Sequence, residues 1–204
     1  MILRRERAAL LVVDMEHDFV HGPMAVAGGA ALAERLRPLV DAAREAGVPV
    51  VFATQALRPG GEDLGRLDRF DVVRSGAALR EGTDGVRVVA ELGARPDDLY
   101  VLKRRFSAFL GTDLDLLLRS RGIEQVAVCG LSAHVCCDTT ARDAFQLGYD
   151  PLYLTDGVAM GDLPDAGWGP VGAAEAQRVV ATILAHRFAT LCTVDELRAE
   201  LAAA

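Results

Sequence analysis

The sequence has no excess of positive charge, no long apolar run and no cysteine pattern typical of a disulfide-stabilised protein. Its 22 lysine and arginine residues are outnumbered by 29 acidic residues, and the formal charge is -7. No basic block stands out, so nucleic acid is not an expected partner. No apolar segment approaches membrane-spanning length, and no membrane association is expected.

The four cysteines, two of them adjacent, are a poor framework for disulfides, and we expect free thiols. The first residues, MILRRERAALLVVD, do not resemble a signal peptide, because strand-like sequence leads directly into an acidic residue. These features predict a cytoplasmic protein. A glycine-rich phosphate loop is also missing after the first predicted strand, which argues against a dinucleotide. We expect no cofactor.

The apolar runs of the chain alternate with amphipathic segments. About half of the 204 residues are apolar and a quarter are charged, as in a globular protein with a sizeable core. The patterns predict strands at 8–13, 48–53, 99–102, 126–129, 151–154 and 189–193, and helices at 30–46, 110–121, 137–147, 173–186 and from 194 onward. This alternation predicts one α/β domain over residues 1–204, with three α-β-α layers and a mainly parallel, Rossmann-like sheet of about six strands.

The segment QVAVCGLSAHVCCDTTARDAF at 125–145 joins a buried strand to a helix and places two adjacent cysteines at the junction. A helix start carries unpaired amide N–H groups and a partial positive charge. Such a position can lower the pKa of a cysteine and bind an oxyanion. Simple packing is the alternative, because cysteine is among the most often buried residue types.

Asp14, Lys103 and Cys136 each follow the C-terminal end of a predicted strand. In a parallel sheet these ends share one edge, where ligands bind in open α/β folds. Asp14 can take the thiol proton as a general base, and Lys103 favours the thiolate. Backbone amides of Ser132 and Cys136 are the predicted oxyanion hole. A turn cap for Asp14 and a surface position for Lys103 are the alternatives.

Three ordered blocks resemble the isochorismatase-like cysteine hydrolases, a superfamily that includes nicotinamidase, N-carbamoylsarcosine amidase and ureidoacrylate amidohydrolase. The blocks are LLVVDMEHDF at 10–19, LKRRFSAFLGTDLDLLLRSRGI at 102–123 and VCGLSAHVCCDTTARDAFQLGY at 128–149. The resemblance implies a catalytic triad of Asp14, Lys103 and Cys136, and a cis peptide at Leu131–Ser132. It also implies a homo-oligomer, either a dimer or a tetramer. Cys137, where the family usually has valine, is assigned to packing.

Two departures from the family patterns bear on the activity. Nicotinamidases carry metal ligands after the second strand, whereas Ala56 and Arg58 stand there in this chain, so no metal is expected. His17 and His21 are the nearby histidines, and without a carboxylate at a known spacing they are more typical of a surface. The cysteine turn, including His134, also resembles true isochorismatases, in which the position of Cys136 is typically not cysteine.

We therefore favour a hydrolase that cleaves an amide-type C–N bond of a small molecule through a cysteine thioester. One alternative is an isochorismatase-type vinyl ether hydrolase that uses Asp14 as the acid without the cysteine. A non-catalytic member of the family is a third possibility. The presence of Asp14, Lys103 and Cys136 together argues against it, because a decayed site would tolerate the loss of any of them.

Five further residues are predicted to contact the substrate: Phe19, Phe106, Phe109, His134 and Trp168. The phenylalanines neighbour the proposed catalytic residues and would form an apolar wall, with ordinary core packing as the alternative. Trp168 lies in the loop DLPDAGWGP and is interpreted as a lid residue, with packing or a subunit contact as the alternative. Arg58 and Arg105 are candidates to pair with a substrate carboxylate. Segments 54–84 and 157–172 are expected to define the substrate.

Overall fold

A computed structural model describes residues 2–203 of the protein and shows a six-stranded sheet in the order β3-β2-β1-β4-β5-β6. Every neighbouring pair of strands is parallel, which confirms the predicted α/β class and the number of strands. The strands are β1 (Ala8–Val13), β2 (Val50–Gln55), β3 (Leu99–Lys103), β4 (Gln125–Leu131), β5 (Asp150–Ala159) and β6 (Thr190–Cys192).

Continuous apolar runs form the middle of the sheet because helices cover both of its faces. All residues of β1 and β4 are buried, whereas the edge strand β3 has two exposed side chains. Parallel strands that are buried on both faces are expected to lack the polar alternation of half-exposed strands. The run of apolar residues before Asp14 is therefore a direct consequence of the central position of β1.

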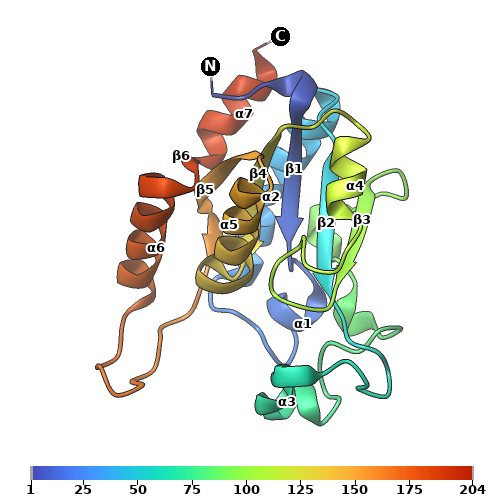
Figure 1. Ribbon diagram of the computed structural model, residues 1–204, viewed down its shortest axis with the longest axis vertical. Helices are drawn as coiled ribbons and strands as arrows, with labels where there is room; N and C mark the ends of the chain where they lie inside the picture. Colours follow the sequence, from blue (N-terminus) through green and yellow to red (C-terminus); the bar gives the residue numbers. More distant parts are fainter. Residues whose placement is uncertain (1, 204) are drawn as a thin grey trace.

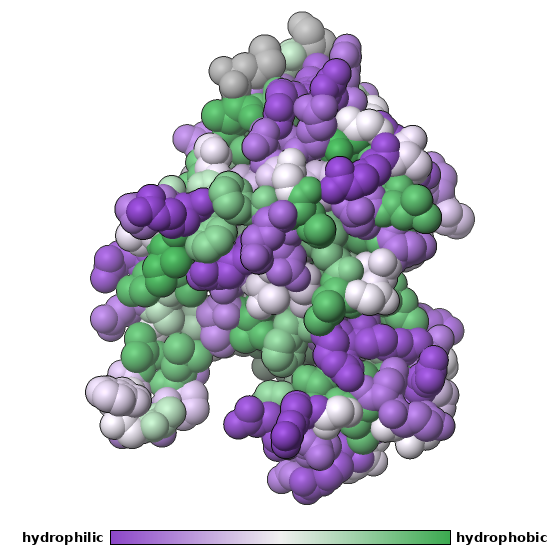
Figure 2. All heavy atoms as spheres, in the orientation of Figure 1, coloured by the Kyte–Doolittle hydropathy of each residue, from purple (hydrophilic) through white to green (hydrophobic). Residues whose placement is uncertain are grey.

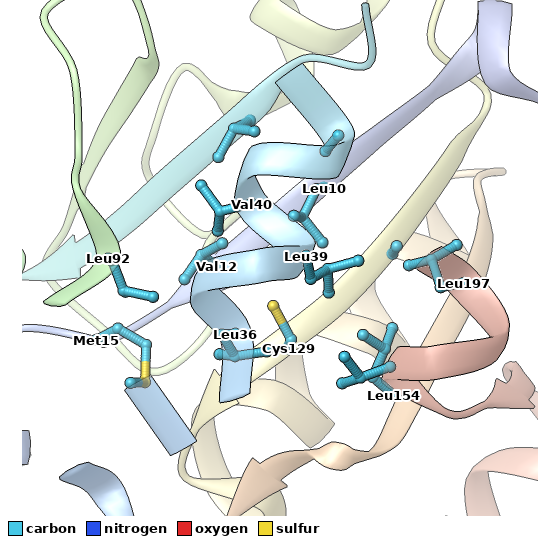
Figure 3. Packing of buried hydrophobic residues seen from close by; sticks show 14 of the residues in the cluster. Leu10, Val12, Met15, Leu36, Leu39, Val40, Leu92, Cys129, Leu154 and Leu197 are labelled. Atoms are coloured by element: carbon cyan, nitrogen blue, oxygen red, sulfur yellow. The ribbon is translucent and has the colours of Figure 1, made fainter. Parts of the chain in front are cut away.

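The helices form one layer on each side of the sheet (Figure 1). On one face, Leu36 and Leu39 of α2 (Gly29–Glu45) and Leu197 of α7 (Val194–Ala202) pack against Leu10 and Leu154 of the sheet (Figure 3). The opposite face is covered by α4 (Leu114–Arg119), α5 (Asp138–Gln146) and α6 (Ala173–Arg187). Within residues 2–203, no helix combines the length and apolar character needed to cross a membrane.

Several elements differ in length from the prediction. The helix predicted at 110–121 begins only at Leu114, because the Thr112 hydroxyl accepts the N–H of Leu114 at 3.2 Å and stabilises a turn before it. Strand β2 continues through Gln55, and β5 continues to Ala159. The segment before α5 forms a π-helical turn over Ala133–Cys137. Most of these differences lie at the carboxyl edge of the sheet.

Two long connections extend beyond that edge (Figure 1). Residues 56–84 form a lobe that contains α3 (Asp71–Arg74) and packs around its own apolar cluster of Leu57, Leu67, Val73, Ala78 and Leu79. Residues 160–172 form an arm between β5 and α6. Figure 2 shows a recess that is open to solvent between the arm and the lobe. The short helix α1 (His17–Val20) lies on the lobe side.

Strands β1 and β4 approach each other closely at Gly130. This residue has a φ of +115°, and a Cβ atom there would overlap the carbonyl oxygen of Val13. Glycine is therefore required for both its backbone conformation and its lack of a side chain. The close approach fixes the end of β1, from which Asp14 follows, next to the end of β4, from which the cysteine turn follows.

Candidate active site

Four adjacent strands each bring one polar side chain to the carboxyl edge of the sheet. Lys103 ends β3, Gln55 ends β2, Asp14 follows β1, and the turn after β4 carries Cys136. The strands are neighbours in the order β3-β2-β1-β4, so residues far apart in sequence converge at this edge. Asp14, Lys103 and Cys136 meet there as expected, and Gln55 joins them.

Lys103 lies at the centre of this cluster and is completely buried. Its Nζ atom lies 2.9 Å from Oδ2 of Asp14 and 3.5 Å from Sγ of Cys136. It also donates to Oε1 of Gln55 at 3.0 Å and to the carbonyl oxygen of Arg105 at 3.1 Å. The alternative of a surface lysine is therefore wrong. Each proton of the ammonium has a partner nearby within the cluster.

The protonation of the cluster follows from burial and from the single cation. Burial disfavours the charged Lys103, but Asp14 and Cys136 outweigh this effect and raise the pKa of its ammonium. Burial likewise raises the pKa of Asp14, although Lys103 and the neighbouring Cys136 act in the opposite direction. Lys103 is therefore an ammonium at neutral pH, next to a carboxylate that can accept a proton.

The pKa of Cys136 is shifted in the direction opposite to the one expected from the helix start. Burial raises the pKa of the thiol well above its usual value, the charge of Asp14 adds to this effect, and Lys103 offsets only part of it. Cys136 is 4% exposed, so the loss of hydration dominates. The resting side chain is a thiol, and the acceptor for its proton is Oε1 of Gln55, 3.9 Å from Sγ.

Gln55 and Glu16 are site residues that the sequence reasoning missed. Oε2 of the fully buried Glu16 accepts the backbone N–H of Gln55 at 2.8 Å. Gln55 Oε1 lies 3.9 Å from Sγ of Cys136 and also accepts a hydrogen bond from Lys103. Burial and the nearby Asp14 raise the pKa of Glu16 well above its usual value. Gln55 has the same sequence signal as Asp14, a polar residue at the end of a buried strand, whereas Glu16 has none.

The turn that carries Cys136 is ordered by backbone hydrogen bonds. The peptide bond Leu131–Ser132 is cis. The amides of Val135 and Cys137 donate to the carbonyl oxygen of Ser132 at 3.2 and 3.1 Å. The hydroxyl of the buried Tyr153 donates to the carbonyl oxygen of Ala133 at 2.9 Å. Cys137 is fully buried in the core, whereas the adjacent Cys136 also lines a cavity.

A cavity of about 420 Å³ adjoins the cluster. Asp14, Gln55, Ser132 and Cys136 contribute polar groups to its surface, and His134 also lines it. The rest of the lining is apolar: Phe19, Met24, Val26, Leu67, Phe70, Val73, Leu79, Phe106 and Val135. Phe19, Phe106 and His134 thus line the same cavity as Cys136, and the 56–84 lobe supplies much of its wall.

Two residues predicted to contact the substrate lie elsewhere. Phe109 is in the core beneath the site, where its ring lies 5.6 Å from that of Tyr149, so the alternative of core packing applies. Trp168 is 98% exposed on the 160–172 arm and does not line the cavity. Arg58 and Arg105 are also outside the lining. The Arg105 guanidinium instead donates to the carbonyl oxygen of Asp63 at 2.9 Å.

The two N-terminal histidines lie outside the cavity lining. Nε2 of His21 lies 2.7 Å from a carboxylate oxygen of Glu91, and the rings of His17 and His21 are 5.8 Å apart. In the part of the chain that the structure describes, no group of three or more histidine, cysteine, aspartate or glutamate side chains is arranged to hold a metal ion.

The chain is similar to a known protein family and to several solved structures. The Isochorismatase domain family model matches residues 8–196. The ureidoacrylate amidohydrolase RutB of Rhizobium rhizogenes is 30% identical over 76% of this chain and 71% of its own length. A crystal structure of a cysteine hydrolase from Pseudomonas syringae pv. phaseolicola has a TM-score of 0.93 and 33% identity, covering 98% of this chain and 95% of that one.

A crystal structure of N-carbamoylsarcosine amidase from Thermoplasma acidophilum is also similar, with a TM-score of 0.74 and 28% identity over 93% of this chain and 97% of that chain. The relatives thus include two amidohydrolases. The family model covers nearly the whole chain, including all four strand ends that form the cluster. The protein therefore belongs to the isochorismatase family of hydrolases.

Proposed function

We propose that this protein hydrolyses an amide-type C–N bond of a small molecule through a thioester on Cys136. The observation that carries this proposal is the contact of Cys136 Sγ with Lys103, which is itself paired with the buried Asp14, beside a cavity that can hold a small substrate. The similarity to two amidohydrolases supports the same reaction class.

In the first half-reaction, Sγ of Cys136 attacks the substrate carbonyl carbon while Asp14 takes the thiol proton. The carbonyl oxygen becomes an oxyanion, for which the backbone amides of Ser132 and Cys136 are the proposed donors. When the tetrahedral intermediate collapses, the C–N bond breaks and Asp14 gives its proton to the leaving nitrogen. Lys103 remains an ammonium throughout and balances the negative charge near Sγ.

In the second half-reaction, water attacks the thioester carbonyl and transfers a proton to Asp14. Collapse of this second intermediate breaks the S–C bond and releases the acid, and the proton returns to the thiolate of Cys136. The two halves use the same base and the same oxyanion donors, so a single arrangement of side chains serves both. Gln55 positions the lysine through its bond to Nζ.

A vinyl ether hydrolase is the second candidate function, and one observation favours it. Burial raises the pKa of Asp14, which would help this residue to act as an acid. In that reaction Asp14 protonates the enol ether carbon, and water adds to the oxocarbenium ion and returns a proton to Asp14. Collapse of the hemiketal then breaks the C–O bond and releases a ketone and an alcohol, and the thiol takes no part. The contact of Cys136 with Lys103, the partner of Asp14, has no role in this mechanism, which is why we favour the amidohydrolase.

The Cys136→Ala variant separates the two functions. A panel of amides and ureido compounds, together with isochorismate, is assayed with the wild type and the variant. An amidohydrolase loses essentially all turnover, by at least about 10³-fold, whereas a vinyl ether hydrolase keeps most of it. Mass spectrometry of the quenched wild-type enzyme should also show the mass of an acyl group on Cys136. Retention of amide turnover by Cys136→Ala would contradict the thioester mechanism.

A further inference from the structure

The cavity beside Cys136 is lined mainly by hydrocarbon. Nine of its 14 lining residues are apolar, and the 56–84 lobe contributes Leu67, Phe70, Val73 and Leu79. Phe19 and Phe106 approach from α1 and from the segment after β3. Apolar walls stabilise a bound hydrocarbon group by removing it from water, at roughly 25 cal/mol per Å² of buried apolar surface.

No lysine or arginine is among the lining residues of this cavity, within residues 2–203. Three cations of this region are held by other groups. Lys103 is completely buried against Asp14, and the Arg105 guanidinium donates to the carbonyl oxygens of Asp63 and Arg104. The buried Arg80 donates to the carbonyl oxygen of Val73 at 2.7 Å. None of these cations is presented to a ligand in the cavity.

His134 supplies the polar group of the wall that the proposed mechanism does not use. Its Nδ1 atom is buried and has no hydrogen-bond partner among the described residues. Loss of hydration lowers the pKa of the imidazole, with Asp138 acting in the opposite direction. A neutral imidazole offers one donor and one acceptor and no charge. It can bind the N–H or C=O of an amide, but it cannot balance a carboxylate.

A substrate carboxylate in this cavity would lose hydration without gaining a cation, and it would approach the negative charge of Asp14. We propose that the enzyme selects uncharged carboxamides that carry an aromatic or branched aliphatic group, and that it discriminates against substrates with a carboxylate. In this arrangement the reacting carbonyl lies at Cys136, the amide is bound by His134, and the hydrocarbon group packs against the phenylalanines. This inference rests on the proposed amidohydrolase function.

Binding to the Cys136→Ala variant tests the inference without requiring chemistry. Calorimetry compares 4-methylphenylacetamide with 4-carboxyphenylacetamide and 3-carboxyphenylacetamide, which have similar shapes. The methyl compound should bind at least about 100-fold more tightly, because a buried carboxylate without a cation is strongly unfavourable. Equal or tighter binding of either carboxylated compound would overturn the inference, as would no binding of the methyl compound at millimolar concentration.

A charge introduced into the wall should reverse the preference. Phe70 lines the cavity and is 41% exposed, so Phe70→Lys can place an ammonium at its rim. In the Cys136→Ala background, this change should strengthen binding of the carboxylated amides by about 10-fold or more and weaken binding of the methyl compound. Leu116→Lys, on α4 outside the cavity and 70% exposed, adds the same charge and should change neither affinity. An equal effect of both substitutions would show that overall charge governs binding.

Turnover by the wild-type enzyme separates this inference from the proposed function. If the methyl compound binds selectively to Cys136→Ala but the wild type forms no acyl-enzyme with it or with any other amide, the amidohydrolase proposal fails while the selectivity of the cavity stands. If a carboxylated amide instead forms the acyl-enzyme faster than its neutral counterpart, the thioester mechanism stands and the inference about the substrate class is wrong.

Discussion

Replacement of Lys103 by methionine should make the stability of this protein strongly dependent on pH. Lys103 and Asp14 are 0% and 1% exposed, and Nζ lies 2.9 Å from Oδ2. Removing one partner of a buried ion pair leaves the other charge uncompensated, which typically costs about 3–5 kcal/mol. The stem of methionine fills most of the space of the lysine side chain, so the main loss is electrostatic.

The cost has an upper limit because Asp14 can take up a proton. Burial already raises its pKa above 3.8, and loss of the cation raises this pKa further. A carboxylic acid can have a higher pKa in the folded than in the unfolded state. Such a group lowers the free energy of unfolding at pH values above its unfolded pKa. At about 1.4 kcal/mol per pH unit, this destabilisation reaches at most about 4 kcal/mol at pH 7, about 2 at pH 5 and almost none near pH 4.

The assay is urea unfolding, followed by circular dichroism, of Lys103→Met and of the double variant Asp14→Asn/Lys103→Met at pH 5 and pH 7. The double variant has no carboxyl group at position 14, so it reports the loss of the other hydrogen bonds of Lys103 alone. It should be more stable than Lys103→Met by several kcal/mol at pH 7 and by much less at pH 5. An equal difference at the two pH values, or no difference at pH 7, would refute the reasoning.

Three other predictions follow from the geometry. Gly130→Ala should abolish stable folding or lower the midpoint of thermal unfolding by more than about 10 °C, because the new Cβ would overlap the carbonyl oxygen of Val13; an unchanged midpoint would contradict this. Cys136 in the free enzyme should react with iodoacetamide at pH 7 more slowly than free cysteine, because burial and Asp14 raise the pKa of its thiol; fast labelling would indicate a preformed thiolate. Glu16→Gln should keep kcat/KM within a few-fold and stabilise the protein increasingly as pH rises. Burial and Asp14 raise the pKa of Glu16, so the wild-type carboxylate destabilises the folded state more at higher pH, and glutamine removes this cost. A destabilisation that grows with pH would show that the negative charge of Glu16 is needed.

Much of the fold and the central three residues could be predicted because the signals were local. A buried strand that ends in a polar residue marks the carboxyl edge of a parallel sheet, and this rule found Asp14, Lys103 and the strand before Cys136. The same rule would have found Gln55, but the predicted strand was ended at residue 53, two residues too early. Strand ends are the least certain part of such a prediction, because side-chain polarity changes there before the backbone pairing stops.

The misplaced residues depended on tertiary geometry that the sequence does not encode locally. Phe106 and Phe109 lie in the same short segment, yet one lines the cavity and the other packs on Tyr149. The turn between them decides which ring faces the site. Trp168 was interpreted as a lid from the composition of its loop; it is 98% exposed and does not line the cavity, and its role as a lid stays a prediction. The pKa of Cys136 differs from the expected direction because burial raises it by more than the partial charge of a helix start can lower it.

The charges of the cluster connect the mechanism to the kind of substrate that the cavity can accept. The cluster has one cation, Lys103, and three groups that can become anions: Asp14, Glu16 and Cys136. A buried site cannot hold three negative charges against one positive charge, so two of the three must keep a proton at rest. Burial raises the pKa of all three, but Lys103 and Cys136 counteract the rise at Asp14, whereas the pKa values of Glu16 and Cys136 are raised well above their usual values, so these two are the groups that keep a proton.

During the proposed attack, the proton of the thiol moves to Asp14 and the negative charge moves to the oxyanion, so the net charge of the site stays the same at every step. A neutral substrate leaves the net charge of the site unchanged from binding until the product acid is formed. The product acid, in contrast, adds a carboxylate to a cavity that offers no cation to it. The same electrostatics that disfavour binding of an anionic substrate therefore favour departure of the anionic product.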